Sequence, residues 1–516
     1  MTRRTTPVKH DGICCDNCGM DPILGHRYKC INCEDYDLCH SCEELEVHDH
    51  KHTFLKLRTE RLTRSDFPFI PAPVPAGSGI GGDIVPPPPP PTLPSSSLFP
   101  PKWGLPEPRQ ERRYTAPPAS FIDTVNQFGF RLQHLITTGN SSSGIAASNI
   151  YRSLMMAASG SQGKSREAFG QVLNFDPNAL YDTVKDVVNL DDYCKPDSAN
   201  SSIELAIASS VWYGRELIIE REWASTMDKI FDAIPGPQDY HAINRWASQN
   251  TRGKINNVVS PQDISPSDIK LMTALYFKAK WSEPFEKYLT HPAAFYGFDN
   301  RRQNCNMMHR TDDLLYWEDS IAQICVLPYQ NNKPSTSIPI PSTPTATSPT
   351  WKAAIILPKN LGLPHLQAIL SHFSHSPSTL RTLLTPTSAT APITGTPPGL
   401  KSTLVHLSLP RFTLRLSQDL SETLFDQGLR PASKPSHDFS QITRTAPVAI
   451  AGVKHDLFVE VNEEGTEIAA VSTTAVFGAM PRAKIPVEMK VERPFLFLVF
   501  DEKSGLVVCV SVVGEV

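Results

Sequence analysis

Side chains able to bind a metal ion are crowded into the first 52 residues of the chain. They form three C-x-x-C pairs followed by two histidines, which is enough for two tetrahedral zinc sites. A segment this short buries little core, so metal binding is expected to supply most of its folding free energy. The eight candidate ligands are Cys15, Cys18, Cys30, Cys33, Cys39, Cys42, His48 and His52; His50 competes with His48, and Cys14 is left over.

The residues between these ligands carry a second signal. Residues 27–30 read RYKC and residues 35–39 read DYDLC. Together with the ligand spacing, these motifs closely resemble the ZZ-type zinc finger, a protein-interaction module. The resemblance implies two structural zinc ions with crossed ligand sets. One ion would be held by Cys15, Cys18, Cys39 and Cys42, and the other by Cys30, Cys33, His48 and His52.

Several ZZ fingers bind the free N-terminus of a peptide or histone tail through acidic residues near the first metal. The matching residues here are Asp16, Asp35 and Asp37. Carboxylates gathered in a partly desolvated pocket would pair with a terminal ammonium. The alternative is that these three residues cap turns around the zinc sites, as aspartate readily does.

A second stretch with functional chemistry begins at residue 466. Alternate residues share one face of an extended chain, and on this face none is charged or proline. The other face carries one carboxylate, Glu467, and then small or β-branched residues that favour extended structure. The segment is therefore competent to enter the interior of a sheet. The inward set is Thr466, Ile468, Ala470, Ser472 and Thr474.

This stretch resembles the bait loop of the serpins. Residues 461–470 read VNEEGTEIAA, residues 493–498 read RPFLFL, and residues 273–285 match the central strand and turn of that family. The resemblance covers the chain from about residue 120 onward. It implies an α+β fold with mixed sheets, surrounding helices and a mobile reactive loop, in which a protease cleaves the loop and is trapped as the loop inserts. The implied hinge is Gly465, Thr466, Glu467, Ile468, Ala469 and Ala470.

The position of the cleaved bond follows from the usual loop length in that family. About fifteen residues from Gly465, at about 3.3 Å per residue in a strand, the bond falls between Ala479 and Met480. A small apolar residue before the bond suits elastase-like or subtilisin-like proteases. A cut after Arg482 would instead suit a trypsin-like protease.

Three further positions match the region where serpin sheets open. His455 corresponds to the histidine beneath the opening point, and its partner position is Thr273. Asn149 replaces a small hydroxyl residue of the family, and Ala146 and Ala147 replace its Ser-Pro. We expect the Thr273 hydroxyl to keep a hydrogen bond to the histidine and the Asn149 amide to alter sheet opening.

Composition divides the chain into three parts. Residues 10–57 form the predicted ZZ finger, and residues 58–117 form a predicted disordered linker rich in proline, glycine and serine. From Phe121 a helical period returns, which places the serpin domain at residues 118–516. Two Ser/Thr/Pro-rich tracts, at about 331–350 and 376–401, are predicted to be inserted loops.

The remaining features restrict the function. No apolar run suits a signal peptide or a membrane span, so an intracellular, cytoplasmic or nuclear protein is expected. A net charge of −4 gives no case for nucleic-acid binding. No catalytic constellation is evident, so the chain is predicted not to be an enzyme. Two hypotheses stay open: a monomeric inhibitor of a serine or cysteine protease, or a non-inhibitory serpin-fold scaffold directed by its ZZ finger.

Overall fold

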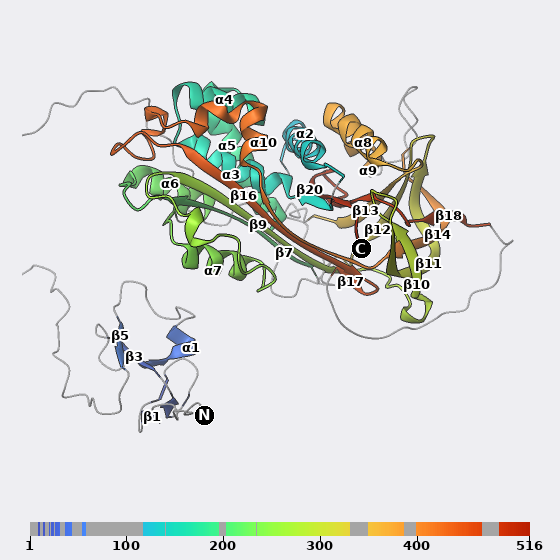
Figure 1. The fold of residues 1–516 in the computed structure, drawn as a ribbon, viewed down its shortest axis with the longest axis horizontal. Helices are drawn as coiled ribbons and strands as arrows, with labels where there is room; N and C mark the ends of the chain where they lie inside the picture. Colours follow the sequence, from blue (N-terminus) through green and yellow to red (C-terminus); the bar gives the residue numbers. More distant parts are fainter. Residues whose placement is uncertain are drawn as a thin grey trace, which may run out of the picture. The chain divides into compact units, whose positions relative to one another are not determined.

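The computed structural model divides into two compact units, 1–102 and 103–516 (Figure 1). In the first unit it describes residues 9–10, 14–15, 20, 22–24, 26–30, 37–43 and 54–57, and in the second it describes residues 117–139, 141–195, 203–233, 235–330, 349–385, 399–466 and 485–516.

The first unit contains two small antiparallel sheets. One pairs β1 (Lys9–His10) with β2 (Ile23–Leu24). The other has β3 (Arg27–Cys30) between β4 (Asp37–Cys39) and β5 (Phe54–Leu57). Helix α1 (His40–Glu43) follows β4 directly. The described core is a handful of buried side chains, half of them cysteines: Cys15, Ile23, Tyr28, Leu38, Cys39 and Cys42.

The second unit is built on two sheets. The six-stranded sheet has the order β15-β16-β17-β9-β7-β8. Its long strands are β16 and β9, which run parallel to each other, while β7 and β15 flank them in antiparallel pairs. Their bounds are β15 Phe412–Asp419, β16 Ile450–Asn462, β17 Gly465–Thr466, β9 Ile269–Lys280, β7 Ile203–Tyr213 and β8 Gly236–Pro237.

The nine-stranded sheet has the order β18-β14-β11-β12-β13-β19-β20-β6, with β10 also paired to β11. Its centre is apolar along whole strands: every residue of β19 and β20 is buried. These two strands form the hairpin that their apolar runs predict. The bounds are β18 Val487–Lys490, β14 Lys401–Pro410, β10 His291–Tyr296, β11 Arg302–Glu318, β12 Ala322–Pro328, β13 Trp351–Pro358, β19 Phe495–Asp501, β20 Val507–Val513 and β6 Ser143–Ile145.

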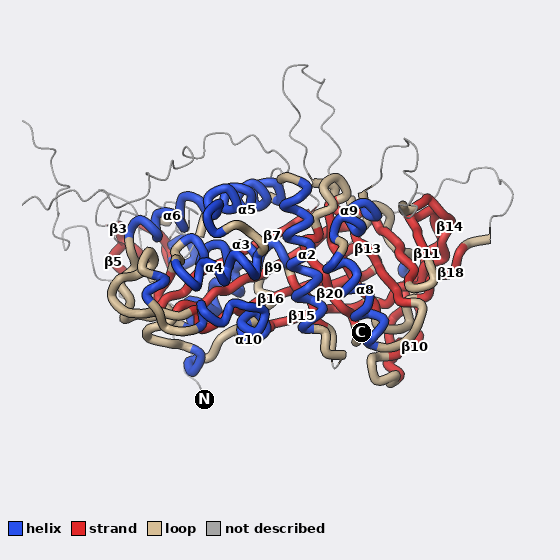
Figure 2. The backbone as a smooth tube through the Cα atoms, turned by 90° about the horizontal axis from the view of Figure 1, so that it is seen from above, coloured by secondary structure: helices blue, strands red, loops and turns tan. Residues whose placement is uncertain are grey.

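Helices cover the six-stranded sheet on both faces. Helix α3 packs on β7 and β9 from one side, and α7 lies against the same strands from the other (Figure 1). Seen from above, α2, α3, α4 and α5 lie together over the strands (Figure 2). The helices are α2 Ala119–Ile136, α3 Ala147–Ser159, α4 Gly163–Leu173, α5 Leu180–Cys194, α6 Arg221–Phe231, α7 Tyr240–Asn250, α8 Leu363–His375, α9 Pro377–Leu384 and α10 Ser421–Leu424.

One boundary differs from the sequence expectation. The tract from 376 to 401 is not all inserted loop, because α9 occupies Pro377–Leu384 and β14 begins at Lys401. The helix forms because Pro377 suits a first turn and Leu380, Leu383 and Leu384 make a buried apolar face. The rest of this tract, and residues 331–348 of the other, lie outside the described residues.

Candidate functional site

The predicted hinge begins as a two-residue strand, β17, that lies between β16 and β9 in the six-stranded sheet. β17 pairs antiparallel with both neighbours: Gly465 and Thr466 face Asn462 and Val461 of β16, and Lys280 and Ala279 of β9. Glycine is needed at 465, because a Cβ there would lie 2.2 Å from the carbonyl oxygen of Ala279.

The first inward side chain of the hinge is already buried. Thr466 has no exposed surface, and its hydroxyl lies 3.0 Å from the hydroxyl of Tyr329. Tyr329 in turn stacks on Trp281, with ring centroids 4.7 Å apart. The alternation predicted for the loop therefore has its first inward residue in the core.

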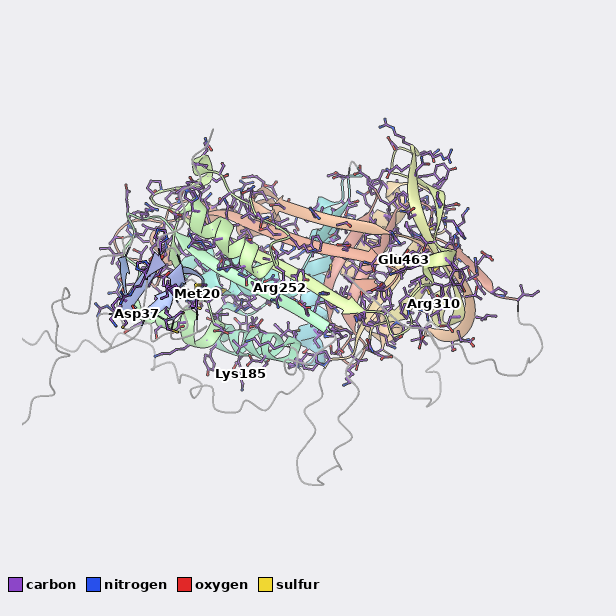
Figure 3. All side chains as sticks on the ribbon, turned by 90° about the horizontal axis from the view of Figure 1, so that it is seen from below. Met20, Asp37, Lys185, Arg252, Arg310 and Glu463 are labelled. Carbon is purple, nitrogen blue, oxygen red and sulfur yellow. The ribbon has the colours of Figure 1, made fainter. Side chains whose placement is uncertain are left out.

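The residues just before the hinge anchor it to the surrounding strands. The buried carboxylate of Glu463, which is labelled in Figure 3, accepts hydrogen bonds from Arg411 and Thr290, each at 2.7 Å. Burial acts to raise the pKa of Glu463, but these two bonds, a backbone hydrogen bond and the charge of Arg411 together hold the pKa below its usual value. Glu463 is thus a charged anchor at neutral pH.

Trp281, which directly follows β9, forms hydrogen bonds with the same turn. Its indole N–H donates to the carbonyl oxygen of Asn462 at 3.0 Å, and its backbone N–H donates to the carbonyl oxygen of Glu464 at 3.0 Å. The side chain of Glu464 pairs with Lys287 at 2.5 Å. The chain entering the hinge is therefore held by both backbone and side-chain contacts.

Beyond β17, the seam between β16 and β9 is closed. The two strands pair in parallel from Ile450 to Phe458 of β16, opposite Ile269 to Tyr276 of β9. A strand that follows β17 along this seam would have to separate these pairs and replace them.

His455 joins the two strands beneath the seam. Its Nδ1 lies 2.8 Å from the hydroxyl of Thr273, and its Nε2 accepts the backbone N–H of Ala146 at 3.0 Å. Because Thr273 donates its hydroxyl proton to the carbonyl oxygen of Lys454, Nδ1 is the nitrogen that carries the proton. Complete burial lowers the pKa of His455 to about 3, so the ring is neutral and both nitrogens are satisfied.

Asn149 joins helix α3 to the strands on one side of the seam. Its amide NH₂ donates to the carbonyl oxygen of Ala274 in β9 at 2.8 Å, and its amide oxygen accepts from Ser209 of β7 at 2.6 Å. The side chain is fully buried. The structure thus brings His455, Thr273 and Asn149 together around the N-terminus of α3.

Several predicted residues of this region lie outside the described part of the chain. These are the remaining hinge residues Glu467, Ile468, Ala469 and Ala470, the bond between Ala479 and Met480, and the alternative cut at Arg482. Conversely, sequence reasoning did not single out Arg411, Thr290, Tyr329 or Ser209, and it gave Trp281 no role beyond its place in the matched stretch 273–285. Their partners lie far away in sequence, so no local spacing marks them.

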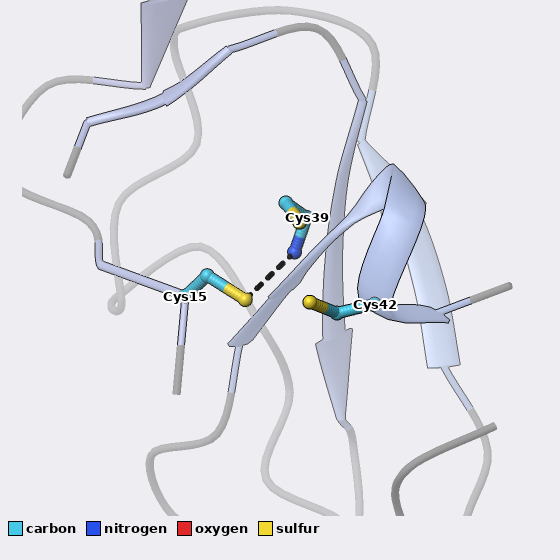
Figure 4. Close-up of side chains that lie close together, drawn as sticks. All are labelled: Cys15, Cys39 and Cys42. Carbon is cyan, nitrogen blue, oxygen red and sulfur yellow. Dashed lines mark hydrogen bonds between the residues drawn. The ribbon is translucent and has the colours of Figure 1, made fainter. Parts of the chain in front are cut away.

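The first unit holds a cluster of buried thiols. The sulfur atoms of Cys15, Cys39 and Cys42 lie within 4.8 Å of one another (Figure 4). The backbone N–H of Cys39 donates to the sulfur of Cys15 at 3.3 Å, a contact that favours a thiolate. Three converging thiols fit a zinc ion. The predicted fourth ligand, Cys18, lies outside the described residues, as do Cys33, His48 and His52.

Asp37 has a structural partner in this unit. Its carboxylate accepts two hydrogen bonds from Arg27, at 2.7 and 3.1 Å, and lies 3.4 Å from the ammonium of Lys29. All three side chains are buried. This carboxylate therefore links β4 to β3. Asp16 and Asp35 lie outside the described residues.

Comparison with known families agrees with this geometry. A model of the family described as Serpin (serine protease inhibitor) matches residues 123–515. The chain belongs to the serpin family. A model described as Zinc finger, ZZ type matches residues 9–53, which identifies the serpin's first unit. The predicted ZZ finger and α+β serpin fold are confirmed.

Two relatives have low sequence identity to this chain, but the alignment covers about nine-tenths of each of them. Iris of Ixodes ricinus is 25% identical over 379 residues, which cover 71% of this serpin and 90% of Iris. Serpin B11 of Mus musculus is 25% identical over 378 residues, which cover 69% of this chain and 89% of that protein.

Solved structures show the same fold. The thermophilic serpin tengpin in its native state has a TM-score of 0.62 at 22% identity, and the alignment covers 77% of this chain and 94% of tengpin. Arabidopsis AtSerpin1 in its native stressed conformation has a TM-score of 0.62 at 19% identity, with 77% and 98% covered. Among the described residues, no helix is long and apolar enough to cross a bilayer.

The low pKa of His455 predicts a specific pH dependence. An unfolded histidine binds a proton below about pH 6.5, whereas His455 in the fold stays neutral to about pH 3. Its contribution to the free energy of unfolding should therefore fall by about 1.4 kcal/mol per pH unit below about 6.5. Neighbouring Asp456, whose pKa burial raises to about 6, has the opposite slope.

Because the two slopes oppose each other, the measurement has to compare the stability of the wild type with that of a variant that lacks His455. Thermal unfolding of the wild type and of His455→Gln between about pH 4 and 7 should show the stability gap between them narrowing as pH falls. A gap that stays constant with pH would show that His455 titrates normally.

Proposed function

We propose that this serpin is an intracellular inhibitor that traps a serine or cysteine protease by loop insertion. The protease nucleophile attacks the carbonyl carbon of Ala479, the bond to Met480 breaks, and the acyl-enzyme forms. The released N-terminal part of the loop then extends β17 as a new strand between β16 and β9.

The observation that carries this proposal is the position of β17 between β16 and β9. The hinge already pairs with both strands between which it would insert, so the first step of insertion needs no search for register. Each further residue would add hydrogen bonds to both neighbours in place of one parallel pairing.

The side chains that follow support the same direction. Thr466 is buried, so an antiparallel continuation would place Ile468 and Ala470 on the same inward face. Glu467 would then point to the opposite face. None of the inward residues is charged, and none is proline.

A non-inhibitory scaffold is the second candidate, and Asn149 favours it. Helix α3 is bonded to β16 through Ala146 and His455, and to β9 and β7 through Asn149. Separating β16 from β9 strains this double attachment. If these hydrogen bonds hold the sheet closed, the loop would be cleaved without trapping the protease.

The test uses the full chain with elastase-like, subtilisin-like, trypsin-like and papain-like proteases. One protease should form a complex that survives denaturing electrophoresis, and the mass of the released fragment should place the cut after Ala479. Ala470→Arg, at a later position of the inward set, should be cleaved without forming the complex, because insertion would carry a charge into the core. Glu467→Arg, on the other face, should still form it. Cleavage without any complex, at every protease, would favour the scaffold.

We propose that the ZZ finger holds two structural zinc ions with the crossed ligand sets described above. The converging thiols of Cys15, Cys39 and Cys42 support the first set. Native mass spectrometry of the full chain should find two zinc ions. Cys39→Ser and Cys30→Ser should each lose one, and Cys14→Ser, at an exposed cysteine, should keep both. A single ion in the wild type would contradict the second set.

We further propose that the finger binds the N-terminus of a partner peptide through Asp16 and Asp35. Asp37 would act by supporting them, since Arg27 and Lys29 occupy its carboxylate. In a fluorescence titration with a panel of free-N-terminus peptides, Asp35→Asn should weaken binding at least tenfold while both zinc ions stay. Glu43→Gln on α1 is the control for a lost charge. Equal affinity for acetylated and free N-termini would refute this mode of binding.

A further inference from the structure

A carboxylate lies buried in the seam between β16 and β9. Asp456 of β16 has no exposed surface, and it lies opposite Ala274 of β9 in the parallel pair. Neither of its carboxylate oxygens has a hydrogen-bond partner among the residues that the structure describes. Burying a polar group without a partner costs free energy, and burying a charge costs more. The seam therefore contains a group that is poorly accommodated while the sheet is closed.

Asp456 and His455 face opposite sides of this seam, because successive residues of a strand point to opposite faces of the sheet. The face of Asp456 is the one that α7 covers. Met272 of β9, which shares this face with Ala274, belongs to one apolar cluster with Ile243 of α7. The other face carries α3 and the hydrogen bonds of His455 described above. The carboxylate is thus separate from the histidine bridge, although both lie on the same two strands.

Burial leaves this carboxylate with a perturbed protonation equilibrium. The ammonium of Lys454, on the same face of β16, donates to the carbonyl oxygen of Val258 at 3.3 Å and lies 3.5 Å from the carboxylate of Asp263. Burial raises the pKa of Asp456 from its ordinary value of 3.8 to about 6, against the smaller opposing effects of the Ser417 hydroxyl and the Lys454 charge. At neutral pH the side chain is therefore ionised inside the closed sheet.

The other titratable groups on this side of the sheet do not pair with Asp456. Arg415 and Lys254 lie over the ring of Phe458, 5.6 and 5.0 Å from its centroid. Among the described groups, none forms a hydrogen bond or an ion pair with Asp456. The groups that the adjoining segments place on this side are Arg415 and Asp419 of β15, Lys454 and Glu460 of β16, Lys270, Tyr276 and Lys278 of β9, Lys254 and Asp263 after α7, and Tyr240, His241 and Arg245 of α7.

Solvent lies one strand away from the buried carboxylate. Ser417 and Arg415 of β15 lie opposite Asp456 and Phe458, on the same face of the sheet, and both are exposed. Separation of β16 from β9 would remove one wall around Asp456 and let water approach it. An ionised carboxylate gains far more free energy from this hydration than a protonated one.

We propose that the ionised Asp456 carboxylate promotes opening of the seam between β16 and β9, and that its protonation keeps the sheet closed. The charge lacks hydration in the closed sheet and regains it when the strands separate. The functional meaning of this inference rests on the proposed insertion of the loop: the inhibitor would admit its new strand faster at neutral pH than in an acidic compartment. Opening itself can be measured without any protease.

The sign and the size of the effect follow from proton linkage. If opening returns the carboxylate from a pKa of about 6 toward 3.8, the ionised seam opens up to about a hundredfold more often than the protonated seam. The frequency of opening should therefore rise with pH between about 4 and 6 and become level above about pH 7.

The experiment is hydrogen–deuterium exchange of the full chain, with mass spectrometry of fragments from β16 and β9, in the wild type and in Asp456→Asn. Exchange rates are taken relative to those of an unstructured peptide at the same pH. The ratio of wild-type to variant opening should grow at least about fivefold from about pH 4.5 to about pH 7.5. Both proteins retain His455, so its titration cancels in the ratio. A ratio that stays constant with pH would show a purely structural effect of the substitution and would overturn the proposal.

Two further variants make the result specific. Glu460→Gln, at a partly exposed position on the same face of β16, removes a charge that water already hydrates, and its ratio to the wild type should not change with pH. Asp456→Ser, a second uncharged variant, should reproduce the behaviour of Asp456→Asn, so the test does not depend on one substitution folding well. Because no protease is present, a failure to trap proteases would leave this pH dependence intact, and its absence would leave trapping intact.

Discussion

The seam between β16 and β9 holds the six-stranded sheet closed, and much of the second unit is arranged around it. Under the proposed mechanism, the same seam must also admit another strand. Parallel backbone pairs close it from Ile450 to Phe458, and the hydrogen bond between His455 and Thr273 reinforces it from below. Burial keeps His455 neutral, so the bridge contains no buried charge whose loss of hydration would have to be offset. A neutral hydrogen bond such as that between His455 and Thr273 stabilises the closed sheet by only a small net free energy, so it can be exchanged for hydrogen bonds to another strand.

The end of the seam at β17 is anchored differently. There, Glu463 bonds with Arg411 and Thr290, Trp281 holds the carbonyl of Asn462, and Gly465 allows β17 to approach the backbone of β9. These contacts fix where the hinge enters the sheet. The anchor is ionic and the bridge below is neutral, so the two ends of the seam respond to pH through different groups.

Local patterns in the sequence predict much of this architecture. The helical period from Phe121 matches α2, the apolar runs near the C-terminus match the β19–β20 hairpin, and the alternation starting at Thr466 agrees with its burial. The anchor was not predictable in this way, because Arg411 and Glu463 are separated by 52 residues and meet only when β15 pairs with β16. Asp37 shows the same limit: its motif was recognised, but its partner Arg27 comes from the neighbouring strand. Helix α9 was missed because three buried leucines outweigh a composition typical of loops.

The double attachment of α3 has a kinetic consequence. In the proposed mechanism, the acyl-enzyme is either hydrolysed, which releases an active protease, or carried away by the advancing strand, and the outcome depends on the ratio of these two rates. The bonds from Asn149 to Ala274 and Ser209 lie on one side of the opening seam and the bond from Ala146 to His455 lies on the other. A difference of about 1.4 kcal/mol in the barrier to separating them changes the rate of strand advance tenfold. Under the proposed mechanism, the Asn149 amide would therefore shift the fraction of encounters that end in capture, and with it the balance between proteases that deacylate fast and those that deacylate slowly.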